Sequence, residues 1–127
     1  MLKFVVGSVA YFCLAAFSGS AAAESDVGAK LFKNHCGACH TIADDGRNRQ
    51  GPLLSGLFKR KAGTLEKYAK YSGGLKKAAW QWTPEQLDLW LTNPKALVPT
   101  TYMGNYKQKD PEKRKIIIDY LKANGGS

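Results

Sequence analysis

The sequence contains few residues that bind metals: its 127 residues include three cysteines, two histidines and two methionines. Beyond the N-terminal segment there is no internal repeat, no low-complexity linker and no alternating apolar–polar run of useful length. These absences exclude a repeat architecture and a sheet-based fold, and the length suits one domain. Acidic residues are also scarce, with 10 Asp and Glu against 19 Lys and Arg, so the formal net charge is +9.

Four of these seven residues lie in one short stretch, His35-Cys36-Gly37-Ala38-Cys39-His40. The spacing Cys-x-x-Cys-His is typical of covalent attachment of a c-type haem. Two thiols one helical turn apart reach the two vinyl groups of one porphyrin, and the next histidine lies beneath the iron. The motif occurs once, so we expect one covalent haem on Cys36 and Cys39, with His40 as the proximal iron ligand.

Three other interpretations of the motif are a thiol redox pair, half of a zinc site, and chance. A thioredoxin-type pair belongs in a βαβ setting, and no such pattern flanks this motif. A structural zinc site needs four ligands, but the only other cysteine is Cys13 and the only other histidine is His35. Haem attachment is therefore favoured, and a large apolar cofactor would supply much of the core of so small a domain.

The N-terminus has the pattern of a secretory signal peptide. Residues 4–17 are mostly apolar, and the alanines at 21–23 provide the small residues of a cleavage site. We expect residues 1–23 to be removed, which eliminates Cys13 and leaves residues 24–127 in the bacterial periplasm. The alternative is an uncleaved membrane anchor, because a transmembrane helix needs about 20 mostly apolar residues and this segment just reaches that length.

The mature part is predicted to be all-α. The first helix should begin near Ser25 or Asp26, since both are good N-cap residues. Its buried face is expected to contain Val27, Leu31 and Phe32. The Gly-rich region 41–81 that follows is too long for a simple connector, so we expect it to wrap around the cofactor.

Two later helices have clear boundary signals. In the first of them, Thr83 is the N-cap, Pro84 occupies the first turn, and Asn93-Pro94 ends the helix. The last helix starts at Asp110-Pro111 and ends at Asn124-Gly125. Their buried faces are expected to contain Leu87, Trp90 and Leu91 in the earlier helix, and Ile117, Tyr120 and Leu121 in the last.

The second axial ligand of the iron is predicted to be Met103, the only methionine left after cleavage. His35 adjoins Cys36 and is held near the proximal side, so it cannot readily reach across the ring. Pro94 and the run Val98-Pro99-Thr100-Thr101 predict an extended loop that presents Met103 to the metal. The alternative is that Met103 fills a gap in the core.

From Gly28 to the last helix, the sequence resembles the class I cytochrome c family of mitochondrial and bacterial electron carriers. The matching residues are Gly28, Phe32, Cys36, Cys39, His40, Gly51-Pro52-Leu53, Gly56-Leu57-Phe58, Arg60, Tyr71, Trp82, Asn93-Pro94-Lys95, Val98-Pro99, Thr101, Met103 and Tyr120-Leu121. The resemblance implies the cytochrome c fold, a small helical domain around one covalent haem.

The resemblance also implies roles for individual residues. The carbonyl of Pro52 would accept a hydrogen bond from the ring of His40 and fix its tautomer. Tyr71, Trp82 and Arg60 would bind or neutralise the haem propionate region, and Thr101 would hold the Met103 loop against a propionate. Gly28, Phe32 and Tyr120 would form the contact between the terminal helices.

The chain departs from the family pattern at two positions. Trp90 replaces a tyrosine whose hydroxyl usually reaches the methionine sulfur, and an indole has a single donor and a different bulk. After Met103 the sequence reads Gly104-Asn105-Tyr106, without the usual phenylalanine two positions later. Tyr106 is the candidate to cover the haem edge instead.

The implied function is that of an electron carrier and not an enzyme, because two axial ligands would leave no iron site for a substrate. The alternatives are a peroxidase-like haem enzyme or gas-binding sensor with a labile Met103 and, more distantly, a thiol oxidoreductase. Each is a different class of function. A carrier should bind carbon monoxide poorly, unlike a haem enzyme or gas sensor. A thiol titration should find no free thiols in a carrier, unlike in a thiol oxidoreductase.

The basic residues form two clusters, Lys59-Arg60-Lys61 and Lys113-Arg114-Lys115. Cations in the first turn of a helix are unfavourable, so we interpret Lys113 and Arg114 as guidance toward acidic docking surfaces on redox partners. Such partners are a quinol-oxidising complex, a terminal oxidase or a dehydrogenase. We expect a monomer that does not bind nucleic acid, and membrane association only if the N-terminal segment is retained.

Overall fold

The computed structural model describes residues 20–43 and 46–126, and the apolar run of the predicted signal peptide lies outside them. The elements are α1 (Ser20–His35), η1 (Leu57–Lys59), α2 (Gly73–Lys77), α3 (Pro84–Thr92), α4 (Pro94–Leu97), α5 (Pro111–Leu121) and η2 (Lys122–Gly126). No strand forms in this part of the chain, where the one bridge is the isolated pair Lys61–Gln81. The all-α prediction is confirmed. None of the helices in the described ranges is long and apolar enough to cross a membrane.

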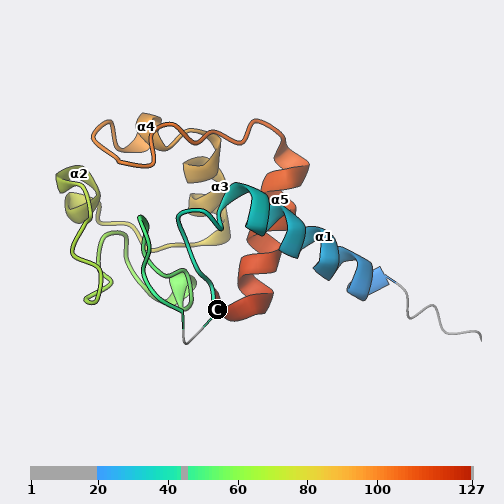
Figure 1. The fold of residues 1–127 in the computed structure, drawn as a ribbon. Coiled ribbons are helices and arrows are strands. Elements are labelled where there is room, and N and C mark those ends of the chain that lie inside the picture. Colours follow the sequence, from blue (N-terminus) through green and yellow to red (C-terminus); the bar gives the residue numbers. More distant parts are fainter. Residues whose placement is uncertain (1–19, 44–45, 127) are drawn as a thin grey trace, which may run out of the picture.

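The terminal helices α1 and α5 pack against each other at the blue and red ends of the colouring (Figure 1). A Cβ atom on Gly28 would lie 2.9 Å from the Cβ of Tyr120, so the two backbones approach this closely only because residue 28 is glycine. One turn later, the Phe32 ring lies 5.7 Å from the Tyr120 ring. These three residues form the contact that the family resemblance implies.

Helix α1 differs from its predicted form in two ways. It begins at Ser20 rather than near Ser25 or Asp26, because alanine, which occupies residues 21–23, has the highest helix propensity of all residues. The expectation that Val27 is buried was wrong, since its side chain is 47% exposed. Gly28 takes the contact with α5, and a neighbouring position points about 100° away around the helix.

Helix α3 follows the sequence prediction closely. The Thr83 hydroxyl accepts a hydrogen bond from the Gln86 backbone N–H at 3.1 Å, and Pro84 occupies the first turn. Leu87, Trp90 and Leu91 are buried, as predicted. Asn93 ends the helix, but Pro94 then opens the short helix α4 in the first-turn position that suits proline.

Helix α5 is capped by Asp110, whose carboxylate accepts hydrogen bonds from the backbone N–H groups of Glu112 and Lys113. It buries Ile117 and Leu121, while Tyr120 is half-buried. Helix α5 itself ends at Leu121, and η2 continues to the predicted end at Asn124-Gly125, where the dihedrals are no longer helical and Gly125 adopts a φ of 101°, which favours glycine.

Arg114 on α5 was predicted to steer partners, and that interpretation was wrong. Its side chain is only 12% exposed and its Nε lies 2.7 Å from an oxygen of Asp88 on α3. The same guanidinium donates hydrogen bonds to the carbonyls of Gln108 and Lys109. Arg114 therefore joins two helices, and the sequence around it carries no signal of that distant partner.

The region 41–81 contains η1 and α2. An isolated antiparallel bridge between Lys61 and Gln81 pairs the middle of this region with its end. The predicted extended run 98–101 is instead a turn, in which the Thr101 N–H donates to the Val98 carbonyl at 3.0 Å. Pro99 has the fixed φ that the second position of such a turn requires. The turn places Thr101 and Met103 on the wall of the pocket described below.

Candidate functional site

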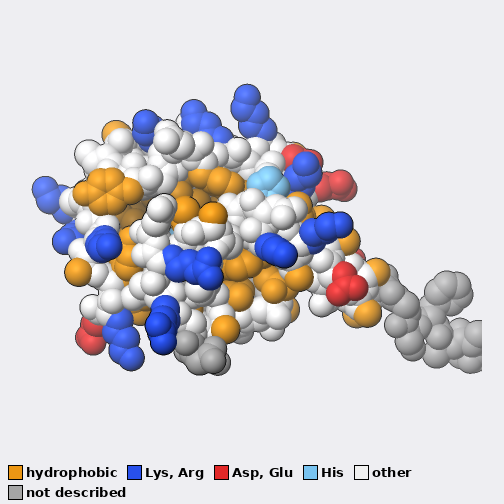
Figure 2. Space-filling view, viewed as in Figure 1, with side chains coloured by type: hydrophobic (Ala, Val, Ile, Leu, Met, Phe, Trp, Pro, Cys, Tyr) orange, Lys and Arg blue, Asp and Glu red, His pale blue; other side chains and the backbone are white. Residues whose placement is uncertain are grey.

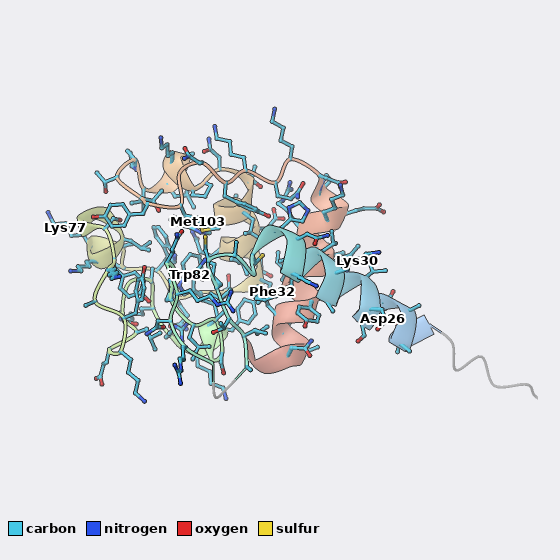
Figure 3. All side chains as sticks on the ribbon, viewed as in Figure 1. Asp26, Lys30, Phe32, Lys77, Trp82 and Met103 are labelled. Atoms are coloured by element: carbon cyan, nitrogen blue, oxygen red, sulfur yellow. The ribbon has the colours of Figure 1, made fainter. Side chains whose placement is uncertain are left out.

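One pocket brings together residues that are far apart in the sequence, from His35 to Leu121. Its walls include all nine site residues predicted from the sequence: Cys36, Cys39, His40, Pro52, Arg60, Tyr71, Trp82, Thr101 and Met103. The remaining walls are largely apolar and include Leu57, Leu87, Leu91, Ile117 and Leu121. Figure 3 shows the labelled Met103 and Trp82 within the fold, enclosed by the ribbon.

The two cysteines lie on a single turn that continues the end of α1. The Cys36 N–H donates to the Phe32 carbonyl at 2.8 Å, and the N–H groups of Cys39 and His40 both donate to the Cys36 carbonyl. This turn holds both thiols and the imidazole on the wall of the same pocket. The geometry suits attachment of one group through two sulfur atoms.

The His40 ring is oriented by Pro52. Its Nδ1 lies 2.7 Å from the Pro52 carbonyl oxygen, which can only accept, so Nδ1 carries the proton. The lone pair of Nε2 is then available to a metal. Burial lowers the pKa of His40, against the opposing effect of the Pro52 hydrogen bond, and this keeps the ring in the neutral form that binds metals.

Gly51 makes room for this ring. A Cβ atom at position 51 would lie 2.2 Å from Cε1 of His40 and 2.7 Å from Nε2, which no side chain permits. The Gly51 N–H also donates to the Cys39 carbonyl at 2.8 Å. No role was predicted for Gly51 from the sequence. The signal that could have indicated one is its position directly before Pro52, whose carbonyl was expected to bind the His40 ring.

The Cys36 thiol does not resemble the reactive thiol of a redox enzyme. Burial, with a smaller effect of the neighbouring Cys39, raises the pKa of Cys36 to about 12. Redox-active thiols have the opposite shift, because their chemistry needs the thiolate. In the described residues no group of three or more Cys, His, Asp or Glu side chains could hold a metal ion, so no zinc cluster forms there.

Met103 is fixed by two hydrogen bonds. Its backbone N–H donates to the buried Thr101 hydroxyl at 3.2 Å. Its sulfur accepts a hydrogen bond from the indole Nε1 of Trp90, also at 3.2 Å. The single donor of the Trp90 indole thus makes the contact to the sulfur that a tyrosine hydroxyl usually makes in the family.

Trp90 belongs to a cluster of the three tryptophans. Its ring centroid lies 5.7 Å from that of Trp82 and 6.3 Å from that of Trp80, and the Trp80 and Trp82 rings meet edge to face at 5.8 Å. Trp82 and Trp90 face the pocket, whereas Trp80 supports them from behind without lining it. Trp82 and Trp90 therefore form a packed aromatic wall of the pocket, and Trp80 packs against both of them.

A polar corner of the pocket contains Arg60 and Tyr71. The Arg60 guanidinium donates to the carbonyls of Ser55 and Leu53, which fixes a cation beside an otherwise apolar cavity. Burial raises the pKa of Tyr71, and the charge of Arg60 partly offsets the shift. A neutral hydroxyl beside a fixed cation suits a buried carboxylate.

Three further tyrosines line the pocket. Tyr68 meets Tyr71 edge to face at 4.8 Å and donates to the Gln50 carbonyl; no motif in the sequence marked it. Tyr106 is half-buried and meets His35 edge to face at 6.4 Å, which places it beside the motif as a cover. Tyr102, next to Met103, is 81% exposed at the pocket mouth.

These features fit a covalently held haem. Two sulfur atoms on one turn, a neutral imidazole with a free Nε2 and a thioether all face one cavity. The cavity is apolar along most of its wall and has one polar corner, which matches a porphyrin with carboxylates on one edge. Gly51 preserves the space that the imidazole requires.

Comparison with known proteins gives one consistent result. Residues 25–124 match the family model described as Cytochrome c. The chain is 39% identical over 110 residues to cytochrome c of Guizotia abyssinica, covering 87% of this chain and 98% of the relative. It is 40% identical over 108 residues to cytochrome c of Ginkgo biloba, covering 85% and 95%.

A bacterial relative is also similar. The chain is 40% identical over 98 residues to "Cytochrome c-type cyt cy" of Rhodobacter capsulatus, covering 77% of this chain and 48% of that protein. Residues 25–124, which match the family model, contain the motif, the tryptophan cluster and the Met103 turn. The chain therefore belongs to the cytochrome c family, and it is an electron-transfer protein, not an enzyme, that carries one covalently bound haem c and acts with redox partner proteins.

Proposed function

We propose that this protein is a periplasmic carrier that moves single electrons between redox partners through a haem with His40 and Met103 as axial ligands. The observation that carries the proposal is that His40 and Met103, from separate segments, face one pocket that also contains both motif thiols. His40 is held by Pro52, and Met103 by Thr101 and Trp90. With both ligands in place, no position remains for a substrate.

Haem c, when bound, supplies a reversible one-electron couple at its iron. Cys36 and Cys39 would anchor it through thioether bonds, and Pro52 holds the proton on Nδ1 of His40, which increases the donor strength of Nε2. Leu57, Leu87 and Ile117 exclude water. A dry, thioether-containing site favours Fe(II), so the reduction potential should be positive.

Arg60, Tyr71 and Thr101 would hold the two carboxylates at the edge of the porphyrin. The Thr101 oxygen accepts the Met103 N–H, which leaves its own proton free to donate into the pocket. Arg60 supplies the positive charge that offsets a buried carboxylate. Residues 101–103 would thus couple propionate binding to the position of the axial sulfur.

The surface supports docking to acidic partners. Figure 2 shows Lys and Arg side chains around apolar side chains that are exposed on one face, with few acidic side chains among them. The exposed Tyr102 and Lys70 both lie at the pocket mouth. A basic rim around an aromatic side chain suits a partner that is acidic at its edge, because such charges guide the approach of the two proteins.

The ligand assignment is tested with Met103→Ala in the haem-loaded protein. We expect loss of the far-red sulfur-to-iron band of the oxidised form, a lower potential, and binding of carbon monoxide to the reduced form. The variant should still fold, because the thioethers and His40 retain the haem. Tyr102→Ala, one position away and exposed, is the matched control and should keep the band. A Met103→Ala variant that also keeps it would overturn the assignment.

The location is tested separately. Protein recovered from the periplasm of an exporting bacterium should have Glu24 as its first residue, as measured by intact mass. A full-length mass with the protein in the membrane fraction would instead indicate a retained anchor. Neither result changes the ligand assignment.

A further inference from the structure

We propose that a surface recess on the outer side of the haem-cavity wall binds small carboxylated dihydric phenols and admits their electrons to the haem. The inference goes beyond the proposed function, because it adds a small-molecule electron donor to the protein partners. The recess has a volume of about 520 Å³, within the range of about 300–1,000 Å³ that small-molecule sites occupy. Its walls are formed by Gln50, Tyr68, Ala69, Lys70, Tyr71 and Tyr102.

The recess and the haem cavity share one wall. Every residue that lines the recess, except Ala69, also lines the haem cavity. Only side chains therefore separate a molecule in the recess from the polar corner of the cavity, where the carboxylate edge of the porphyrin belongs. An electron that leaves such a molecule has to pass no more than the rings of Tyr68 and Tyr71 to reach the cofactor.

Two tyrosine rings of this wall are held in place. The Tyr68 and Tyr71 rings meet edge to face, with 4.8 Å between their centroids. Tyr68 is buried, and its hydroxyl donates to the Gln50 carbonyl. Aromatic rings pack on one another edge to face or with an offset, so a fixed pair of them favours a flat aromatic ligand over a branched aliphatic one.

The third tyrosine is available to cover a ligand. Tyr102 is 81% exposed, and within the described part of the chain no hydrogen bond or ring contact holds its side chain. A ring with so much exposed surface is stabilised by packing against a second ring. Ala69 contributes only a methyl group to the wall, which leaves the recess open.

The polar groups of the recess suit an anion that also carries hydroxyl groups. Lys70 is exposed and forms no ion pair with any described residue, so its ammonium is available to a carboxylate. The Gln50 amide can donate to or accept from a phenolic hydroxyl. It accepts from the Cys39 thiol at 3.4 Å, but that donor is lost when the thiol becomes a thioether. None of the described residues that line the recess is acidic.

A dihydric phenol with a carboxylate matches all of these groups, and its electron transfer balances without another reactant. The bound phenol gives one electron to the oxidised haem. One of its O–H bonds breaks, and the proton passes to bulk water at the open side of the recess. The phenol leaves as a neutral phenoxyl radical, and two such radicals then yield one quinone and one phenol.

The kinetic test uses haem-loaded protein and two isomeric dihydroxybenzoates. Gentisate has its hydroxyls para to each other and is oxidised to a quinone, whereas α-resorcylate has them meta and is not. The rate of haem reduction should saturate as gentisate rises, and α-resorcylate should inhibit it competitively. Hydroquinone, which lacks the carboxylate, should reduce the haem without saturation over the same concentrations. A gentisate rate that rises linearly, or that α-resorcylate does not inhibit, would overturn the inference.

Two pairs of variants locate the site. Lys70→Gln should raise the half-saturating gentisate concentration about two- to fivefold, as expected for an exposed ion pair. Lys67→Gln removes the same charge from an exposed lysine outside the recess and should leave that concentration unchanged. Ala69→Leu should abolish saturation, because it fills the recess from a position that does not line the haem cavity, whereas the exposed Ala79→Leu should not. Equal effects within either pair would contradict the site.

Binding is also measured without electron transfer. In the reduced protein, the ring protons of α-resorcylate should show nuclear Overhauser effects to the Ala69 methyl group and to the Tyr102 ring, and their absence would refute the site. The competing occupant is a side chain of a protein partner. In that case Ala69→Leu would slow the reaction with an acidic redox protein and leave the gentisate rate unaltered, which would overturn the assignment to a small molecule.

Discussion

Nε of Arg114 on α5 lies 2.7 Å from Oδ1 of Asp88 on α3, and the two residues form the ion pair that joins these helices. The same guanidinium also donates to the Gln108 and Lys109 carbonyls at 3.0 and 3.1 Å. Arg114 thereby fixes the segment that enters α5 as well as the helix pair. Three partners around one cation make this a structural contact, since a rim charge would be free to meet another protein.

Replacement of Arg114 by Ala should lower the free energy of unfolding by about 1–2 kcal/mol, because a charged donor is lost from several acceptors. Lys113→Ala removes the same charge from a side chain that is 49% exposed and should cost less than about 0.5 kcal/mol. Denaturant unfolding of both haem-loaded variants measures the difference. Equal losses of unfolding free energy in the two variants would indicate that the net charge, and not the contacts of Arg114, determines the effect.

Gly51→Ala should displace the His40 ring, because the added Cβ would lie 2.2 Å from Cε1. We expect a lower yield of correctly ligated haem and a stability loss of about 1–3 kcal/mol, as in other overpacked sites. Gly73→Ala is the control, since its Cβ would meet no atom within 4 Å. The haem absorbance per protein and the unfolding midpoint should be altered in Gly51→Ala alone.

Replacement of both Cys36 and Cys39 by Ala should abolish covalent attachment and leave a poorly folded chain. The pocket walls include buried core residues such as Leu57, Leu87 and Leu121, and without haem these surfaces face an open space. Mass spectrometry measures the attachment and thermal unfolding measures the fold. A compact haem-free variant with a cooperative transition would show that the core is independent of the cofactor.

Electron transfer with an acidic partner should slow steeply as salt rises, because the Debye length falls from about 10 Å at 0.1 M to 3 Å at 1 M. Lys70→Glu at the pocket mouth should slow the reaction more than Lys30→Glu on α1, which does not line the pocket. Both variants change the net charge equally. Stopped-flow rates that fall equally in the two would argue against docking at the pocket mouth.

Local signals accounted for most of what could be predicted about the fold. Thr83 and Asp110 cap their helices as expected, because a cap depends on side chains and N–H groups only two or three residues apart. The Cys36–His40 motif and its place on one turn have the same short range. By contrast, the turn at 98–101 was missed, since Pro99 suits both an extended segment and a turn.

Relationships between distant residues were not accessible in the same way. The exposure of Val27 depends on how α1 meets α5, and the role of Arg114 depends on Asp88. The family resemblance identified which residues line the pocket, but not that the Trp90 indole reaches the Met103 sulfur. That contact depends on packing among three rings, which no periodicity encodes.

The close approach of Gly28 to Tyr120 has a consequence for the order in which the molecule is completed. The partners belong to the first and last long helices, so the contact can form only when nearly the whole chain has been synthesised. Cys36 and Cys39 are made early and precede most of the residues that later enclose them. The two thiols are therefore synthesised before Ile117 and Leu121 of α5 can close the pocket over them, and the packing of α5 on α1 is among the last contacts of the fold to form.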